Sequence, residues 1–103
     1  MTGTKVVYLI KELSPGKKYT AIVDGKKVSF GALGYSDYTK HKDTARKKRY
    51  IARHKGNENW KRSGVKTAGF WSRWLLWNKP TITASLSDME DKFNLHIIRK
   101  RNL

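Results

Sequence analysis

Basic side chains crowd into residues 40–66, about a quarter of the chain. This stretch holds 11 Lys or Arg residues against two acids, so it carries nine of the fifteen net positive charges. Cation arrays of this density bind phosphate backbones, because each contact releases counterions condensed on the nucleic acid. Arg is better suited than Lys where its planar fork can bridge phosphate oxygens. The chemistry that this stretch predicts is therefore phosphate binding.

The pattern predicts a helix over residues 43–54 within this stretch. At 100° per residue, one broad side of the helix carries Thr44, Ala45, Ile51 and Ala52. The other side carries a basic stripe made of Lys42, Arg46, Arg49 and Arg53. Asp43 and Lys47 are spaced to pair at i,i+4 near its start. We expect the apolar side to fasten the helix to the domain and the stripe to face outward.

These charges define a predicted nucleic-acid interface with a centre and a margin. The central contacts are predicted at Lys42, Arg46, Lys47, Arg49 and Arg53. Three more residues widen the interface, Lys61, Arg62 and Lys66, and two basic turns assist it, Lys17-Lys18 and Lys26-Lys27. The sequence shows no zinc finger, basic zipper or RNA-recognition signature. We therefore expect binding to the phosphate backbone, largely without sequence preference.

The titratable residues do not form a catalytic pattern. A nuclease needs carboxylates or His residues grouped around a metal or a water molecule. His41 and His54 are 13 residues apart, about 220° around a continuous helix, and Gly56 separates His54 from Glu58. The basic turns also lack the flanking residues of a phosphate-binding loop. We expect no enzyme activity, catalytic residue, metal or cofactor.

Aromatic residues gather in a second predicted helix over residues 68–80, AGFWSRWLLWNKP, which Pro80 ends. One side of this helix carries Phe70, Trp71, Trp74, Leu75 and Trp77. Such a stripe is typical of a core or a subunit interface, although exposed rings can also stack on bases. Because a small domain has little room to hide four Trp residues, we predict a homodimer.

The remaining elements predict one α+β domain over residues 1–103. Strands are expected at 5–13, 19–23 and 28–30, with a hairpin at Asp24-Gly25. Residues 94–100 form a further strand that can join this small antiparallel sheet. Ser87 begins a capping-box pattern for a short third helix. Whether residues 35–38 pack inside or contact a ligand stays open.

Composition agrees with a polyanion partner. The 103 residues are 38% hydrophobic and carry a formal charge of +15, so the chain can fold but repels itself. It has no Cys, no signal-peptide pattern and no long apolar run, and we expect a soluble intracellular protein. The basic and apolar surfaces lie on different segments, which argues against a membrane anchor.

Residues 28–90 resemble small basic proteins encoded by large double-stranded DNA viruses of eukaryotes. Three motifs carry the resemblance: SDYT at 36–39, YIARH at 50–54 and GFWSRWLLW at 69–77. The resemblance implies a virus-encoded protein of the virion, the cytoplasmic virus factory or the host nucleus. It implies no site residues, because these viral proteins have no assigned activity. RKKR at 46–49 is similar to a nuclear import signal.

The favoured interpretation is a dimeric, genome-associated protein that binds double-stranded DNA. Two alternatives stay open, a virion or host-interaction adaptor for acidic proteins and an RNA-binding protein. The sequence does not decide between DNA and RNA.

Overall fold

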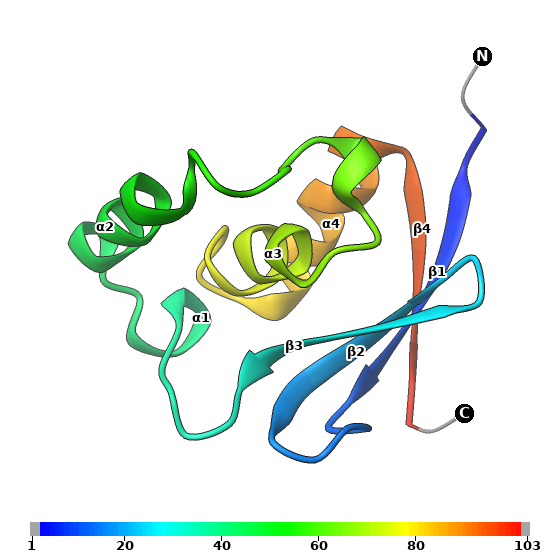
Figure 1. The fold of residues 1–103 in the computed structure, drawn as a ribbon, viewed down its shortest axis with the longest axis horizontal. Coiled ribbons are helices and arrows are strands. Elements are labelled where there is room, and N and C mark those ends of the chain that lie inside the picture. The colour runs from blue at the N-terminus through cyan, green and yellow to red at the C-terminus, as the bar shows by residue number, and fades with distance from the viewer. Residues whose placement is uncertain (1–2, 102–103) are drawn as a thin grey trace.

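A four-stranded sheet packed against helices forms the body of the protein. The computed structural model describes residues 3–101. Along the chain come β1 (Lys5–Lys11), β2 (Lys17–Val23), β3 (Lys26–Ala32), α1 (Tyr38–His41), α2 (Thr44–His54), η1 (Arg62–Gly64), α3 (Ala68–Trp71), η2 (Ser72–Leu76), α4 (Ile82–Phe93) and β4 (Leu95–Lys100). The predicted α+β class is confirmed (Figure 1).

The sheet has the strand order β3-β2-β1-β4. Its first three strands form the predicted antiparallel meander, and the turn at Asp24-Gly25 has positive φ at both residues, as a tight hairpin requires. The C-terminal strand also joins the sheet, but it runs parallel to β1, with Val7 opposite Ile97. The sheet is therefore mixed rather than purely antiparallel. A parallel neighbour needs a crossover, which the whole helical region provides.

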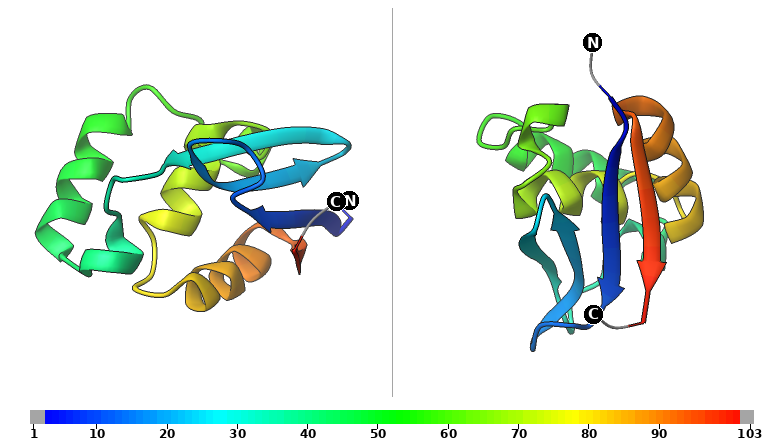
Figure 2. Two further views of the ribbon diagram at one scale, coloured as in Figure 1. Left: turned by 90° about the horizontal axis from the view of Figure 1, so that it is seen from below. Right: turned by 90° about the vertical axis from the view of Figure 1, so that its right-hand side faces the viewer.

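The core lies between one face of the sheet and the helices (Figures 1 and 2). Alternate strand residues such as Val7, Leu9 and Phe30 point into it, and the Trp-rich segment supplies the opposite wall. Phe70, Trp71 and Leu75 are buried in this core, and Trp74 and Trp77 pack against it. The prediction that the aromatic stripe belongs to the core is confirmed, because all five side chains pack into or against the core of their own chain.

Two helices differ from their predicted bounds. The Trp-rich helix begins at Ala68 as expected but ends at Leu76 with a π-helical turn, four residues before Pro80. The third helix was predicted to begin at Ser87, and this was wrong. It begins at Ile82, where the Thr81 hydroxyl accepts a hydrogen bond from the Ala84 amide. The helix begins before the capping box at Ser87, because the longer helix buries Leu86, Met89 and Phe93.

Gly64 sits where the chain turns into the Trp-rich helix and has no space for a side chain. A Cβ there would lie 2.0 Å from the Asn59 carbonyl oxygen, which is backbone and cannot rotate away. Asn59 is held by its own hydrogen bonds to Ser63 and to the Lys61 amide. This loop therefore depends on glycine at position 64.

Replacing Gly64 by Ala is expected to lower the free energy of unfolding by about 1–3 kcal/mol, the usual cost of overpacking. The control is Gly56→Ala, since a Cβ at Gly56 meets no atom within 4 Å; we expect a change of at most about 0.5 kcal/mol there. Urea unfolding followed by Trp fluorescence measures both variants. Equal stability of the two variants would show that the loop relaxes freely.

Candidate nucleic-acid interface

The Arg residues of α2 line a groove beside the body of the protein. One wall is α2 with Arg46, Arg49 and Arg53, and the other is formed by the start of β2, the end of β3 and the start of α3. The groove has a volume of about 830 Å³. Tyr50 and Trp77 contribute to its floor. In Figure 1, α2 stands apart from the sheet, and α1 lies between α2 and the end of β3.

The helix itself forms as predicted, but the side that fastens it was wrongly assigned. Thr44, Ala45 and Ala52 are exposed, whereas Tyr50 is buried. The Tyr50 ring stacks on Trp77 with centroids 4.5 Å apart and planes at 3°. Large aromatic area outweighs small alanine side chains, so the helix rotates to bury tyrosine. The Arg stripe consequently lies beside the buried side and faces the groove.

Lys47 belongs to this buried side rather than to the basic surface. Its ammonium donates a 2.5 Å hydrogen bond to the Asn78 carbonyl and lies 4.8 Å from the centre of the Tyr38 ring. Burial, and then the nearby Arg73 guanidinium, lower the pKa of Lys47. Lys47 therefore helps to attach α2 to the rest of the protein, and it does not belong to the predicted nucleic-acid interface. The pair with Asp43 does not form, because that carboxylate caps α2 by accepting from the Ala45 and Arg46 amides.

Three guanidinium groups remain for an external partner. Within residues 3–101, no carboxylate lies within 4.0 Å of Arg46, Arg49 or Arg53. Lys17, exposed on the opposite wall, adds a fourth cation to the groove, and Glu58 contributes a carboxylate. Four cations against one unpaired carboxylate give a strongly positive groove. The stripe is shorter than predicted, because Lys42 precedes the helix as the left-handed C-cap of α1.

Tyr50 on the groove floor stays neutral. Burial, and then the negative charge of Glu58, raise the pKa of Tyr50 to about 12. Its phenol therefore keeps its proton through the physiological range, and it contributes no negative charge to the groove. The His54 ring packs against the same ring at a tilt of 36°, with centroids 4.4 Å apart.

Lys18 lies inside the protein, although the sequence placed it among the assisting cations. Its ammonium lies 2.5 Å from the Asp37 carboxylate, and only 7% of Lys18 and 2% of Asp37 are exposed. The same carboxylate caps α1 by accepting from the Thr39 amide. This buried pair fixes the loop between β3 and α1, and neither charge is available to a ligand. No sequence rule links residues 19 positions apart.

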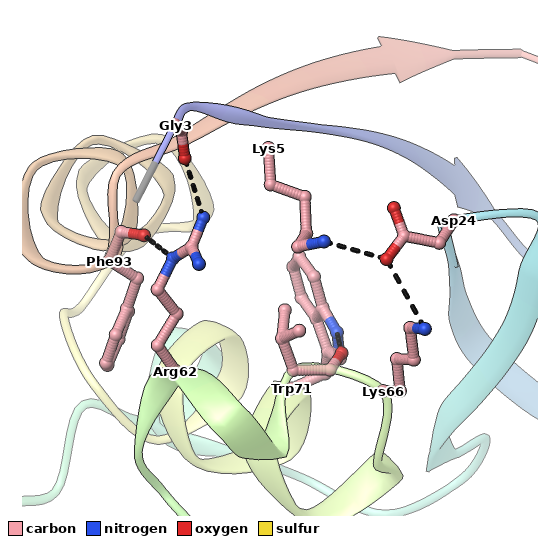
Figure 3. Close-up of polar contacts among 8 residues, drawn as sticks. Gly3, Lys5, Asp24, Arg62, Lys66, Trp71 and Phe93 are labelled. Atoms are coloured by element: carbon pink, nitrogen blue, oxygen red, sulfur yellow. Dashed lines mark hydrogen bonds and ion pairs between the residues drawn. The ribbon is translucent and has the colours of Figure 1, made fainter. Parts of the chain in front are cut away.

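Arg62 also has a structural role (Figure 3). Its guanidinium donates to the carbonyl of Phe93 at 2.7 Å and to that of Gly3 at 2.9 Å. The first contact satisfies a carbonyl at the C-terminus of α4, which has no partner within the helix. Arg62 thus joins η1 to the start of β1 and the end of α4 through two of its donors.

The other cations that the sequence predicted at the margin of the interface do not lie together. Lys66 pairs with Asp24 at 3.3 Å, and Lys5 approaches the same carboxylate at 2.7 Å (Figure 3). Lys61 is exposed beside η1. Lys26 and Lys27 are exposed on the β2–β3 hairpin, at the opposite end of the molecule from α2 (Figure 1). The structure therefore brings together Lys17, Arg46, Arg49 and Arg53 and leaves these residues outside the groove.

Arg73 packs on the Trp residues. Its guanidinium carbon lies 4.3 Å from the Trp74 ring centre and 5.5 Å from that of Trp60, and it donates to the Trp77 carbonyl. It supports the Trp-rich segment rather than the groove.

Within residues 3–101, no three His, Asp or Glu side chains are grouped as metal ligands. No helix in the same residues is long and apolar enough to cross a membrane.

The buried Lys18–Asp37 pair has a measurable consequence. Asp37→Asn keeps a helix-capping side chain but leaves the Lys18 ammonium without a counter-charge, so we expect the free energy of unfolding to fall by about 3 kcal/mol or more. Urea unfolding followed by Trp fluorescence measures the change.

Asp91→Asn is the matched control, since Asp91 is exposed on α4; it should change stability by about 0.5 kcal/mol or less. Similar stabilities for the two variants would contradict a buried, charged pair.

Part of this region is similar to a sequence family. Residues 7–54, which run from β1 to the end of α2, match a family of unknown function, DUF5754. The match covers just under half of the chain and includes the Arg wall of the groove but not its Trp floor. No curated protein and no solved structure matches the chain.

Proposed function

We propose that this protein binds nucleic acid through its phosphate backbone, with Arg46, Arg49 and Arg53 as the main contacts and double-stranded DNA as the expected ligand. The observation that carries the proposal is that these three guanidinium groups lie on successive turns of one helix and have no acidic partner among the described residues. The helix fixes the spacing of their Cα atoms, and no internal ion pair has to be broken when a phosphate arrives.

The spacing of the stripe suits a regular polyanion. Positions i, i+3 and i+7 are separated by about 4.5 Å and about 6 Å along a helix axis. A duplex carries one charge about every 3.4 Å along each strand, and long Arg side chains can adjust to that repeat. Each guanidinium can bridge two phosphate oxygens. These contacts read no base edge, so the proposed binding is largely independent of sequence.

The biological setting is a further part of the proposal. A virus-encoded, genome-associated role, in the virion, the host nucleus or a cytoplasmic virus factory, rests on the sequence resemblance and the charge of +15. The homodimer stays a prediction, but its reason has weakened because each of the four Trp residues packs within one chain. Absence of enzyme activity also stays a prediction.

The proposal predicts that position matters more than the number of charges. We expect Arg49→Gln/Arg53→Gln to weaken binding to a random duplex by about 10- to 100-fold, since two charge-assisted contacts are lost. Lys26→Gln/Lys27→Gln removes the same charge from the distant hairpin and should weaken binding by about threefold or less. Fluorescence anisotropy at low salt measures both.

Equal losses in the two double variants would mean that the whole charge attracts DNA and that α2 has no special part. If the unaltered protein bound no duplex at low salt, the proposed function would be wrong. Binding of an acidic peptide in that case would favour the adaptor alternative.

A further inference from the structure

The geometry points to a second, more selective site within the groove: we propose that it takes one unpaired nucleic-acid strand, with Tyr35 stacking on a base. This inference rests on the proposed phosphate binding by α2 and deepens it. It assigns the groove floor and the loop before α1 to bases, and the Arg wall to the backbone of the same strand.

Tyr35 is unusual among the aromatic side chains. It is 75% exposed, more than the other large hydrophobic residues of the described chain. Every other Phe, Tyr or Trp ring of residues 3–101 contacts another ring by its face or edge or lies under a cation, whereas no such contact is found for Tyr35. An aromatic face left open at the edge of a cationic groove offers what an unpaired base needs, because stacking requires a free ring face.

The backbone on both sides of Tyr35 is anchored. Before it, the Leu33 amide donates to the Gly16 carbonyl, and the Tyr35 amide lies 3.4 Å from the Ala32 carbonyl. After it, Asp37 is buried in its pair with Lys18. The ring is therefore displayed by a constrained loop, which lowers the entropic cost of stacking. This gives the Lys18–Asp37 pair a role in positioning the site.

The size of the groove favours one strand over two. The groove volume of about 830 Å³ lies in the range of sites for small molecules, so it can hold one or a few unpaired nucleotides but cannot enclose a duplex. A duplex must lie across the mouth of the groove, where the Arg side chains can still reach it. A single strand can enter and bring its bases to the floor.

The lining has the mixed character of a base-binding site. Arg46, Arg49 and Arg53 on one wall and Lys17 on the other can hold phosphates. Ser36, His54, Glu58 and Ser72 supply hydrogen-bonding groups along the groove. Glu58 repels phosphate but can accept a hydrogen bond from a base N–H group, so it favours an orientation with bases inside and backbone toward α2.

Another exposed tyrosine provides a matched control. Tyr8 lies in the middle of the sheet on β1, is 38% exposed, and has the Lys100 ammonium 4.9 Å from its ring centre. Tyr8 does not line the groove. Removing either ring takes away one exposed aromatic group without changing the charge, and only Tyr35 borders the proposed site.

The test compares the fluorescence anisotropy of three kinds of labelled ligand. They are base-bearing strands of about 15 thymidines and of about 15 uridines, an abasic strand of the same length, and a matched duplex. Tyr35→Ala should weaken binding to the strand with bases about 5- to 100-fold, change duplex and abasic binding less than about twofold, and be rescued by Tyr35→Phe. Tyr8→Ala should leave all three affinities unchanged.

The outcomes separate this inference from the proposed function. If the duplex binds but Tyr35→Ala affects no ligand, or affects all three alike, the strand site is wrong while backbone binding by α2 stands. If the unaltered protein binds none of the ligands, both proposals fall. Dependence on Tyr35 with either the thymidine or the uridine strand supports the site, and the tighter of the two identifies DNA or RNA as its source.

Discussion

The stacking of Tyr50 on Trp77 is the contact on which the arrangement of charge depends. A helix with four Arg and Lys side chains in a row, RKKR at 46–49, is repelled by a domain of the same sign, and exposed helices gain little from propensity alone. The near-parallel rings, 4.5 Å apart, and the hydrogen bond from Lys47 to Asn78 hold α2 in place against that repulsion. Because the helix is held by this one side, the adjacent Arg residues line the groove, although their side chains are exposed.

The attachment of α2 has an energetic cost at Lys47. Burial and the neighbouring Arg73, Lys79 and Lys92 disfavour its charge, and the nearby Asp88 only partly compensates. The carbonyl of Asn78 accepts a hydrogen bond from the Lys47 ammonium, while the side-chain amide of Asn78 donates to Asp88 at 2.8 Å. The base of α2 is thus joined to α4 through a polar chain. These contacts set the orientation of the Arg wall, and they also set the position of the groove between α2 and the sheet.

Local patterns predicted most of the elements, since strands and tight turns are encoded by neighbouring residues. The Asp24-Gly25 hairpin is of this kind. Side-chain partners distant in sequence were not predictable: Lys18 finds Asp37 and Arg62 finds Phe93 only after the chain has folded. The side of α2 that packs was missed for a related reason, because a periodicity based on alanine ignores the greater contact area of a tyrosine that meets tryptophan.

The most direct measurement of the account is the salt dependence of duplex binding. Four free cations around the groove should give a slope of log K against log[salt] of about −3.6, since each neutralised phosphate contributes about −0.9. Replacing Arg46, Arg49 and Arg53 together by Gln should make the slope shallower by about 2.7. A slope near zero in the unaltered protein, or one that the triple replacement leaves unchanged, would contradict the claim that these three guanidinium groups meet phosphates.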